Sequence, residues 1–217
     1  MIRGTNYLFG KERDIFHRTT KILSRFMEEN GYQEFIPSSL AYEEVFIKKA
    51  GKEISNQMYT FRDKKNRKLC LIPEVTAIVQ KLYKENWEKS SPKPIRLYYL
   101  AKCYRYERPQ AGRYREFWQF GIEHLGGKSP ADKEEVLNLL REAIMFFLPR
   151  SYWRINPQVK RGLDYYIEDG FEIIVPTLGA QKQLCGGGRY DCGVGWAIGV
   201  DRLCLVYKEF IKGENDK

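Results

Sequence analysis

Long apolar runs are scarce in this sequence. No stretch of its 217 residues approaches the roughly 20 apolar residues that a helix needs to cross a bilayer. The first residues, MIRGTNY, also lack the apolar stretch of a secretory signal peptide. These absences argue against a membrane protein and against a secreted one. We therefore expect a cytoplasmic protein with no membrane partner.

Cysteine and histidine are also sparse. The five cysteines are scattered, odd in number and form no CxxC pair, which argues against a disulfide framework and a structural zinc site. Two histidines, His17 and His124, give little material for a histidine-based metal centre or a Ser-His-Asp triad. We expect His17 to be solvated and His124 to have a structural or incidental role. No metal site made of protein side chains is predicted.

Apolar residues make up 43% of the chain and aromatic residues 14%, which is enough to build a core. The length favours a single domain over residues 1–217. The chain has 37 lysines and arginines against 28 acidic residues, a net charge of +9. That surplus suggests a polyanionic partner such as nucleic acid or nucleotide phosphate, and a solvated basic surface is the alternative interpretation.

Apolar periodicity predicts helices separated by clusters of strands. Helices are expected over residues 11–30, after Pro73, over 130–147 and in a last segment that ends near Phe210. Strands are expected over residues 32–37, 58–61, 68–72, 95–107, 114–123, 152–155, 162–167 and 171–175. A glycine-rich run over residues 186–199 leads into the last helix, and its glycine triplet by itself favours a flexible turn. Hairpin-joined strands between helices predict an α+β domain with an antiparallel sheet flanked by helices.

The most informative segment is YRYERPQAGRYREFWQFGIE, residues 104–123. Its arginines bracket a turn, and guanidinium groups suit phosphates because the planar fork donates two parallel hydrogen bonds. Strand alternation groups cations, an aromatic ring, an amide and carboxylates on one face: Arg105, Glu107, Arg113, Arg115, Phe117, Gln119 and Glu123. An ordinary charged hairpin is the alternative. We favour a site that binds a nucleotide beside a small polar ligand. Burying these charged and polar side chains without a ligand would cost desolvation free energy.

This hairpin resembles motif 2 of class II aminoacyl-tRNA synthetases, in its histidyl-tRNA synthetase version. Other segments resemble the same family in the same order: RGT at residues 3–5, the end of motif 1 at 31–37, PEVT at 73–76, RGLDYY at 161–166, GGRYD at 187–191 and motif 3 at 195–203. The resemblance spans nearly the whole chain. It implies the class II catalytic fold, an antiparallel sheet of about six strands. Because motif 1 builds a twofold interface in that class, it also implies a homodimer.

The resemblance implies an ATP site in which ATP is accompanied by Mg²⁺. Arg105 would bind the α-phosphate, where charge develops during adenylate formation, and Arg113 would bind the outer phosphates. Glu107 would accept a hydrogen bond from the adenine amino group. Phe117 would stack on one side of the ring, and Arg202 would cover the other side and reach the γ-phosphate.

The same resemblance implies a histidine pocket. Arg161 would contact both the α-phosphate and the carboxylate of the amino acid, with Gln119 nearby on the carboxylate side. Glu74 and Thr76 would hold the ammonium group. Arg105 and Arg161 are the expected catalytic residues.

Three residues of this pocket would surround the imidazole ring of the substrate. Glu123 and Tyr166 would contact its two nitrogens, which suits a neutral ring with one donor and one acceptor. Tyr190 would close the pocket, and Tyr165 belongs to the same histidine-binding segment as Tyr166.

The sequence departs from the family pattern at several places. Ile72 stands where family members usually carry an arginine, and the loop before motif 3 is reduced to residues 192–194. The stretch between Glu123 and Arg161 is too short for the insertion domain of bacterial members. The chain also leaves no room after motif 3 for a C-terminal anticodon-binding domain. We therefore expect a single catalytic domain.

Four functions fit to different degrees. The first is activation of histidine to histidyl-adenylate followed by transfer to tRNA, with recognition through the acceptor stem. The second is the same activation for a different acceptor. The third is a histidine-sensing regulatory subunit that binds an ATP phosphoribosyltransferase catalytic subunit, although such relatives typically lose the arginines that persist here. The fourth, a basic nucleic-acid-binding protein, explains the charge but not the pocket.

Overall fold

The computed structural model describes residues 1–47, 51–127, 129–160, 163–179 and 181–215. The helices are α1 (Gly10–Glu29), α2 (Glu44–Ile47), α3 (Gly51–Gln57), α4 (Thr76–Leu82), α5 (Pro130–Met145) and α6 (Val200–Asn215), with short turns of other helix types at Tyr83–Trp87 and Arg150–Tyr152. The strands are β1 (Gln33–Glu34), β2 (Leu40–Tyr42), β3 (Thr60–Arg62), β4 (Lys68–Leu71), β5 (Ile95–Tyr104), β6 (Glu116–Leu125), β7 (Arg154–Val159), β8 (Gly170–Ile174), β9 (Gln183–Tyr190) and β10 (Gly193–Gly199).

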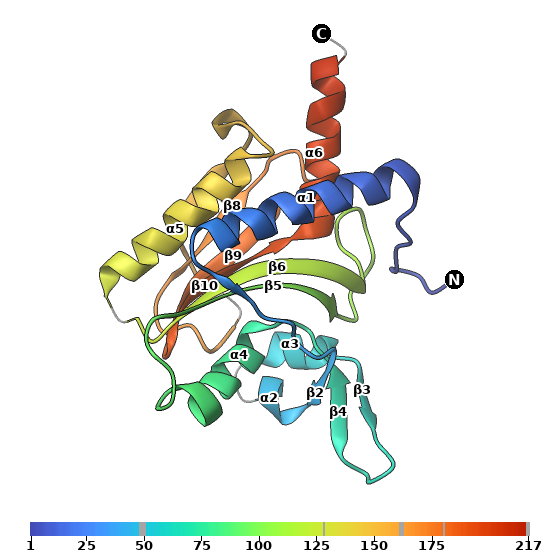
Figure 1. Ribbon diagram of the computed structural model, residues 1–217. Coiled ribbons are helices and arrows are strands. Elements are labelled where there is room, and N and C mark those ends of the chain that lie inside the picture. The colour runs from blue at the N-terminus through green and yellow to red at the C-terminus, as the bar shows by residue number, and fades with distance from the viewer. Residues whose placement is uncertain (48–50, 128, 161–162, 180, 216–217) are drawn as a thin grey trace.

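A seven-stranded sheet organises the chain in the order β1-β5-β6-β10-β9-β8-β7. Its neighbouring strands are antiparallel, except that β1 runs parallel to β5. A smaller antiparallel sheet has the order β2-β4-β3. Helices α1 and α5 cover one face of the large sheet, while α4 and the small sheet lie on the other side (Figure 1). The predicted α+β class with a helix-flanked sheet is confirmed.

Two apolar clusters hold these layers together, one on each side of the large sheet. The larger joins α1, α5 and α6 to the sheet, and the residues that α1 contributes include Leu23, Phe26 and Met27. The smaller joins α4 and the small sheet to the opposite face, around Ile72, Val75 and Tyr99. Burial of such side chains is the main favourable term in folding. The active-site candidates lie on the side of the smaller cluster.

The start of α5 is fixed by a capping box that involves Ser129 and Asp132. The Ser129 side chain accepts a hydrogen bond from the Ala131 amide at 3.1 Å, and the Asp132 carboxylate accepts one from the Ser129 amide at 2.7 Å. Pro130 occupies the first turn, where a missing N–H costs little. These residues set the helix start that the sequence predicts.

Three sequence predictions need correction. The strand expected over residues 32–37 is only β1, and it pairs in parallel. A strand was expected over residues 162–167, but residues 163–167 form turns instead, with a β-bridge between Tyr166 and Tyr190. Gly162 lies outside the described residues. The glycine triplet is not a flexible turn, because it lies inside β9 and pairs with β10.

Within the described ranges, no helix is both long enough and apolar enough to cross a membrane.

Candidate active site

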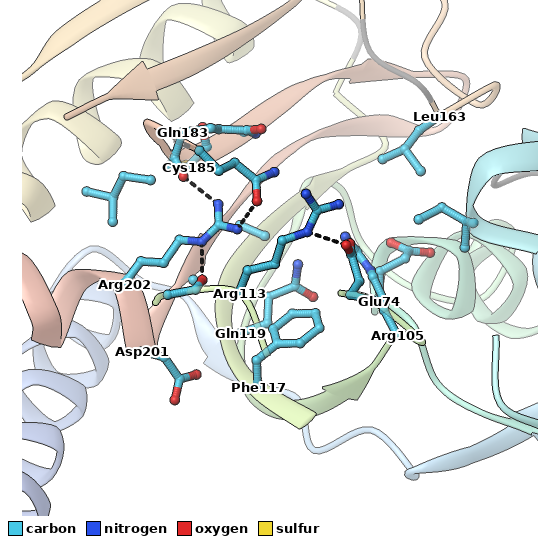
Figure 2. A pocket seen from close by; sticks show the side chains of 18 of the residues that line it. Glu74, Arg105, Arg113, Phe117, Gln119, Leu163, Gln183, Cys185, Asp201 and Arg202 are labelled. Atoms are coloured by element: carbon cyan, nitrogen blue, oxygen red, sulfur yellow. Dashed lines mark hydrogen bonds and ion pairs between the residues drawn. The ribbon is translucent and has the colours of Figure 1, made fainter. Parts of the chain in front are cut away.

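A cavity of about 240 Å³ lies among β6, β9, β10, the start of α6 and the loop between β5 and β6 (Figure 2). Most of the predicted site residues line it: Glu74, Thr76, Arg105, Glu107, Arg113, Phe117, Gln119, Tyr165, Tyr166 and Arg202. Glu123 and Tyr190 are buried next to these lining residues, with 0% and 1% of their surfaces exposed. Arg161 lies outside the described residues. The structure thus brings the described candidates together, while their individual roles remain predictions.

Three arginines give one part of the cavity its positive charge. Arg105 Nε donates to the Pro73 carbonyl oxygen at 2.9 Å, and its guanidinium carbon lies 5.3 Å from the centre of the Phe117 ring. Arg113 forms an ion pair with Glu107. These contacts hold cations beside an aromatic face, an arrangement that suits a nucleotide because its phosphates are anionic and its base can stack.

Three hydrogen bonds to oxygen atoms fix the position of the Arg202 guanidinium group. It donates to the Gly112 carbonyl, the Gln183 carbonyl and the Gln181 side chain, each at 2.6 Å. Burial lowers the pKa of Arg202, and the positive charges of Arg105 and Arg113 lower it further. A bound anion would relieve this mutual repulsion, so this part of the cavity favours phosphate.

Gly112 makes the tight turn beside Arg202 feasible. Its φ of +71° is in the left-handed region that glycine adopts without strain, and a Cβ there would lie 3.2 Å from Arg202 Cγ. Glycine is therefore favoured at this position of the predicted loop, because its backbone is left-handed and Arg202 lies close to it.

Glu74 is buried, with 3% of its surface exposed. One carboxylate oxygen accepts from the Ala77 amide at 2.9 Å at the start of α4, and the other accepts from the Tyr165 hydroxyl at 3.3 Å. Burial raises the pKa of Glu74, while these hydrogen bonds and the charge of Arg105 act in the opposite direction. The carboxylate is therefore fixed in place beside the cavity, where a cationic ligand group would be stabilised.

Glu123 lies deeper and is held at both oxygens. The Thr76 hydroxyl donates to one oxygen at 2.6 Å, and the Tyr190 hydroxyl donates to the other at 2.5 Å. Burial raises the pKa of Glu123 to about 8, with the nearby charge of Glu74 adding to the shift. Such a carboxyl can change protonation near neutral pH, so it can either accept a hydrogen bond from a ligand N–H or donate one to a ligand nitrogen.

The glycine-rich strands make space for these side chains. A Cβ on Gly195 would lie 2.3 Å from a carboxylate oxygen of Glu123, and a Cβ on Gly188 would lie 2.8 Å from the Tyr166 ring. Both glycines sit inside a regular pair of strands. Glycine is needed at these positions because a larger residue would displace Glu123 or Tyr166.

Several residues around the cavity were not predicted from the sequence. Gln57, Gln181, Gln183 and Asp201 also line it. Asp201 accepts from the Trp118 amide at 2.7 Å and so ties the start of α6 to β6. Its place next to Arg202 in the segment that resembles motif 3 was a usable signal, whereas nothing distinguished the two glutamines near Arg202.

Of the two histidines, His17 is solvent-exposed as expected, and the role of His124 stays a prediction. His17 is exposed on α1, and His124 is buried with 1% of its surface exposed. Burial lowers the pKa of His124. None of the five cysteines, all of which lie among the described residues, forms a disulfide, and burial raises the pKa of Cys103 and of Cys70, which favours the uncharged thiol.

The chain is similar to known proteins over most of its length. The family model described as histidyl-tRNA synthetase matches residues 10–152, which include the whole β5–β6 hairpin. The chain belongs to the histidyl-tRNA synthetase family. A histidine–tRNA ligase of Archaeoglobus fulgidus is 30% identical over 305 aligned residues, covering 93% of this chain and 74% of the relative.

Solved structures agree with this family. The apo histidyl-tRNA synthetase of S. aureus superposes with a TM-score of 0.79 at 27% identity, covering 96% of this chain and 70% of that one. A Bacillus halodurans protein titled as an ATP phosphoribosyltransferase regulatory subunit/histidyl-tRNA synthetase gives a TM-score of 0.80 at 16% identity, with 95% and 82% covered, which shows a shared fold. The predicted class II catalytic fold is confirmed. In this histidyl-tRNA synthetase family member, motif 2 corresponds to the β5–β6 hairpin and motif 3 to β10 with the start of α6.

Proposed function

We propose that this chain activates histidine with ATP, giving histidyl-adenylate and pyrophosphate, and then transfers histidine to tRNA. The main observation behind this proposal is that one cavity combines a positively charged part with a part that holds buried carboxyl groups. Arg105, Arg113 and Arg202 supply positive charge, while Glu74 and Glu123 supply buried carboxyl groups. A substrate with an anionic end and a cationic or N–H-bearing end matches both.

On the nucleotide side, the carboxylate oxygen of histidine attacks the α-phosphorus of ATP, and the bond to the pyrophosphate oxygen breaks. Arg105 stabilises the charge that develops on the α-phosphate, and Arg113 and Arg202 hold the outer phosphates and the base. Phe117 provides the ring on which adenine stacks. Mg²⁺ enters with ATP as part of the substrate and neutralises the charge of the outer phosphates.

On the amino-acid side, the existing hydrogen bonds set the orientation of each group. The Thr76 hydroxyl proton is directed to Glu123, which leaves the lone pairs of the hydroxyl oxygen for the substrate ammonium beside Glu74. The Cys103 thiol lies 3.4 Å from Gln119 Oε1 and donates to it, which leaves the Gln119 amide N–H groups for the substrate carboxylate. Glu123 and Tyr166 then contact the imidazole nitrogens.

The main alternative is a regulatory subunit that binds histidine and an ATP phosphoribosyltransferase. The shared fold with the Bacillus halodurans protein supports it. The three cationic side chains at the cavity favour the enzyme instead, because a histidine sensor needs no triphosphate site. Activation of histidine for an acceptor other than tRNA uses the same cavity and is separated by the acceptor assay below.

Histidine-dependent exchange between ATP and pyrophosphate tests the activation step. The wild-type chain is expected to catalyse exchange only when histidine is present. Arg105→Ala is expected to lower the exchange rate by about 10²- to 10³-fold, because one donor to the developing charge is lost. Arg25→Ala is the control, since this exposed arginine on α1 pairs with Glu29 on the same helix and its removal should leave the rate unchanged. Histidine binding without exchange would contradict the proposal.

Two further measurements separate the alternatives. Transfer of labelled histidine to whole tRNA supports aminoacylation, and exchange without transfer indicates another acceptor. Copurification with an ATP phosphoribosyltransferase catalytic subunit, in the absence of exchange, would support the regulatory subunit.

A further inference from the structure

A second cluster of ligand-bearing side chains lies away from the cavity. His124, Asp132 and Glu135 each offer one ligand atom, and these atoms all lie within 4.8 Å of one another. His124 is on β6, and the two acidic residues lie three positions apart on α5, on one helix face. Side chains alternate along a strand, so His124 points to the sheet face opposite that of Glu123. The cluster is therefore separate from the candidate active site.

The His124 ring has an unsatisfied nitrogen. Its Nε2 atom is buried and has no hydrogen-bond partner among the residues that the structure describes. Asp132 Oδ1, 3.7 Å away, lies beyond hydrogen-bond distance. A buried polar atom without a partner costs free energy, so an occupant between the ring and the carboxylate would remove that cost.

Each of the three side chains has an outer contact at one of its two possible ligand atoms. Tyr32 Oη lies 3.5 Å from His124 Nδ1, the Ser129 amide donates to Asp132 Oδ2 at 2.7 Å, and Arg96 Nη2 donates to Glu135 Oε1 at 2.9 Å. Metal-binding histidines and carboxylates are typically oriented by outer partners of this kind. The contacts therefore arrange one nitrogen and two carboxylates around a common point.

We propose that His124, Asp132 and Glu135 bind a divalent transition-metal ion, with zinc the best match, and that the ion joins β6 to α5. Zinc takes imidazole nitrogen and carboxylate oxygen at about 2.0–2.2 Å, which places neighbouring ligand atoms roughly 3.4 Å apart. The 3.7 Å between His124 and Asp132 is close to that value. Glu135 supplies the third ligand from within 4.8 Å of the other two ligand atoms, and water completes the coordination.

The charges around the cluster favour zinc over magnesium. Arg96 faces the cluster and neutralises part of the charge of Glu135. Arg189 also lies nearby, and it donates to the main-chain oxygens of Gly127 and Ser129. These two arginines would weaken the binding of any metal ion that is held by carboxylate charge alone. A bond to imidazole nitrogen is less affected, and zinc and cobalt form such bonds more readily than magnesium or calcium does.

The test is a zinc titration of the full, tag-free and EDTA-treated chain by calorimetry, followed by absorption spectra with Co²⁺. One zinc ion per chain is expected. Asp132→Asn and Glu135→Gln keep an oxygen for the outer hydrogen bond and are expected to weaken zinc binding at least about tenfold. His124→Ala is expected to abolish the site. Because the chain has only two histidines, His17→Ala is the matched control and should bind zinc as the wild type does.

Three results would overturn the proposal. The first is the absence of zinc binding by the wild-type chain. The second is binding that survives both Asp132→Asn and Glu135→Gln, which remain informative even if His124→Ala does not fold. The third is a cobalt spectrum with thiolate charge-transfer bands, because it would place the ion on a cysteine such as the partly exposed Cys204.

Discussion

Among single residues, Glu123 couples the site to the stability of the chain. Its carboxyl is fully buried and its pKa rises from 4.5 to about 8 on folding, with burial as the main cause. The folded state therefore holds a proton that the unfolded state releases between these pH values. The stability contributed by that proton is fully present below about pH 4.5 and is lost as the pH rises to about 8.

Glu123→Gln is expected to remove this loss, because glutamine cannot ionise and can still form hydrogen bonds with Thr76 and Tyr190. Relative to the wild type, the free energy of unfolding of the variant should increase as the pH rises from about 5 to 8. Urea denaturation at several pH values, with EDTA present and no histidine, measures the difference. Glu29→Gln, at an exposed position on α1, controls for the removal of a carboxylate. Parallel pH profiles of Glu123→Gln and the wild type would contradict the prediction.

Residue identities in the site were easier to predict than their contacts. The alternation of residues 113–123 indicated that Phe117, Gln119 and Glu123 share a face, and the structure places the first two in the cavity wall and the third buried behind it. The pairing of Glu123 with Thr76 could not be predicted from spacing, because the partners are far apart in the chain. Likewise, no local pattern indicated that Gln181 and Gln183 hold Arg202.

Among the elements, β9 and β10 show how glycine shapes the site. Gly195→Ala is expected to lower the free energy of unfolding by about 1–3 kcal/mol, the usual cost of overpacking, because the new Cβ would meet both Glu123 and the Ile122 carbonyl oxygen at 2.4 Å or less. Urea denaturation measures this loss. Gly213→Ala on α6 is the control, since nothing lies within 4 Å of its Cβ, and it should be neutral or stabilising by up to about 1 kcal/mol. Equal stability of the two variants would argue against a steric role for Gly195.

The same strands explain why some elements were predicted well and others were not. The helices α1 and α5 have regular apolar periodicity and, for α5, a capping box, so local chemistry determines them. The glycine triplet favours a turn when judged locally. It forms a strand because its neighbours on both sides are paired strands and because large side chains fill the space beside it. Tertiary contacts therefore override local preference where the chain builds its site.

For the whole molecule, the assembly predicted from the family resemblance is a homodimer. The segment that resembles motif 1 includes β1, which forms the edge of the large sheet, and Ile36 beside it is 80% exposed. Phe9 at the start of α1 is 90% exposed. A large exposed apolar side chain at an open sheet edge, such as Ile36, favours burial against a second copy, and a twofold interface would use the same residues on both chains.

Sedimentation of the purified chain tests this prediction. The wild type is expected to sediment as a dimer and Ile36→Asp mainly as a monomer, because each interface would place two carboxylates in an apolar contact. Ile167→Asp is the matched control, since Ile167 is 63% exposed but lies outside the motif 1 segment, and it should remain dimeric. Circular dichroism of both variants checks that the fold is kept. A monomeric wild type would contradict the predicted dimer, and equal dimerisation of the two variants would place the interface away from Ile36.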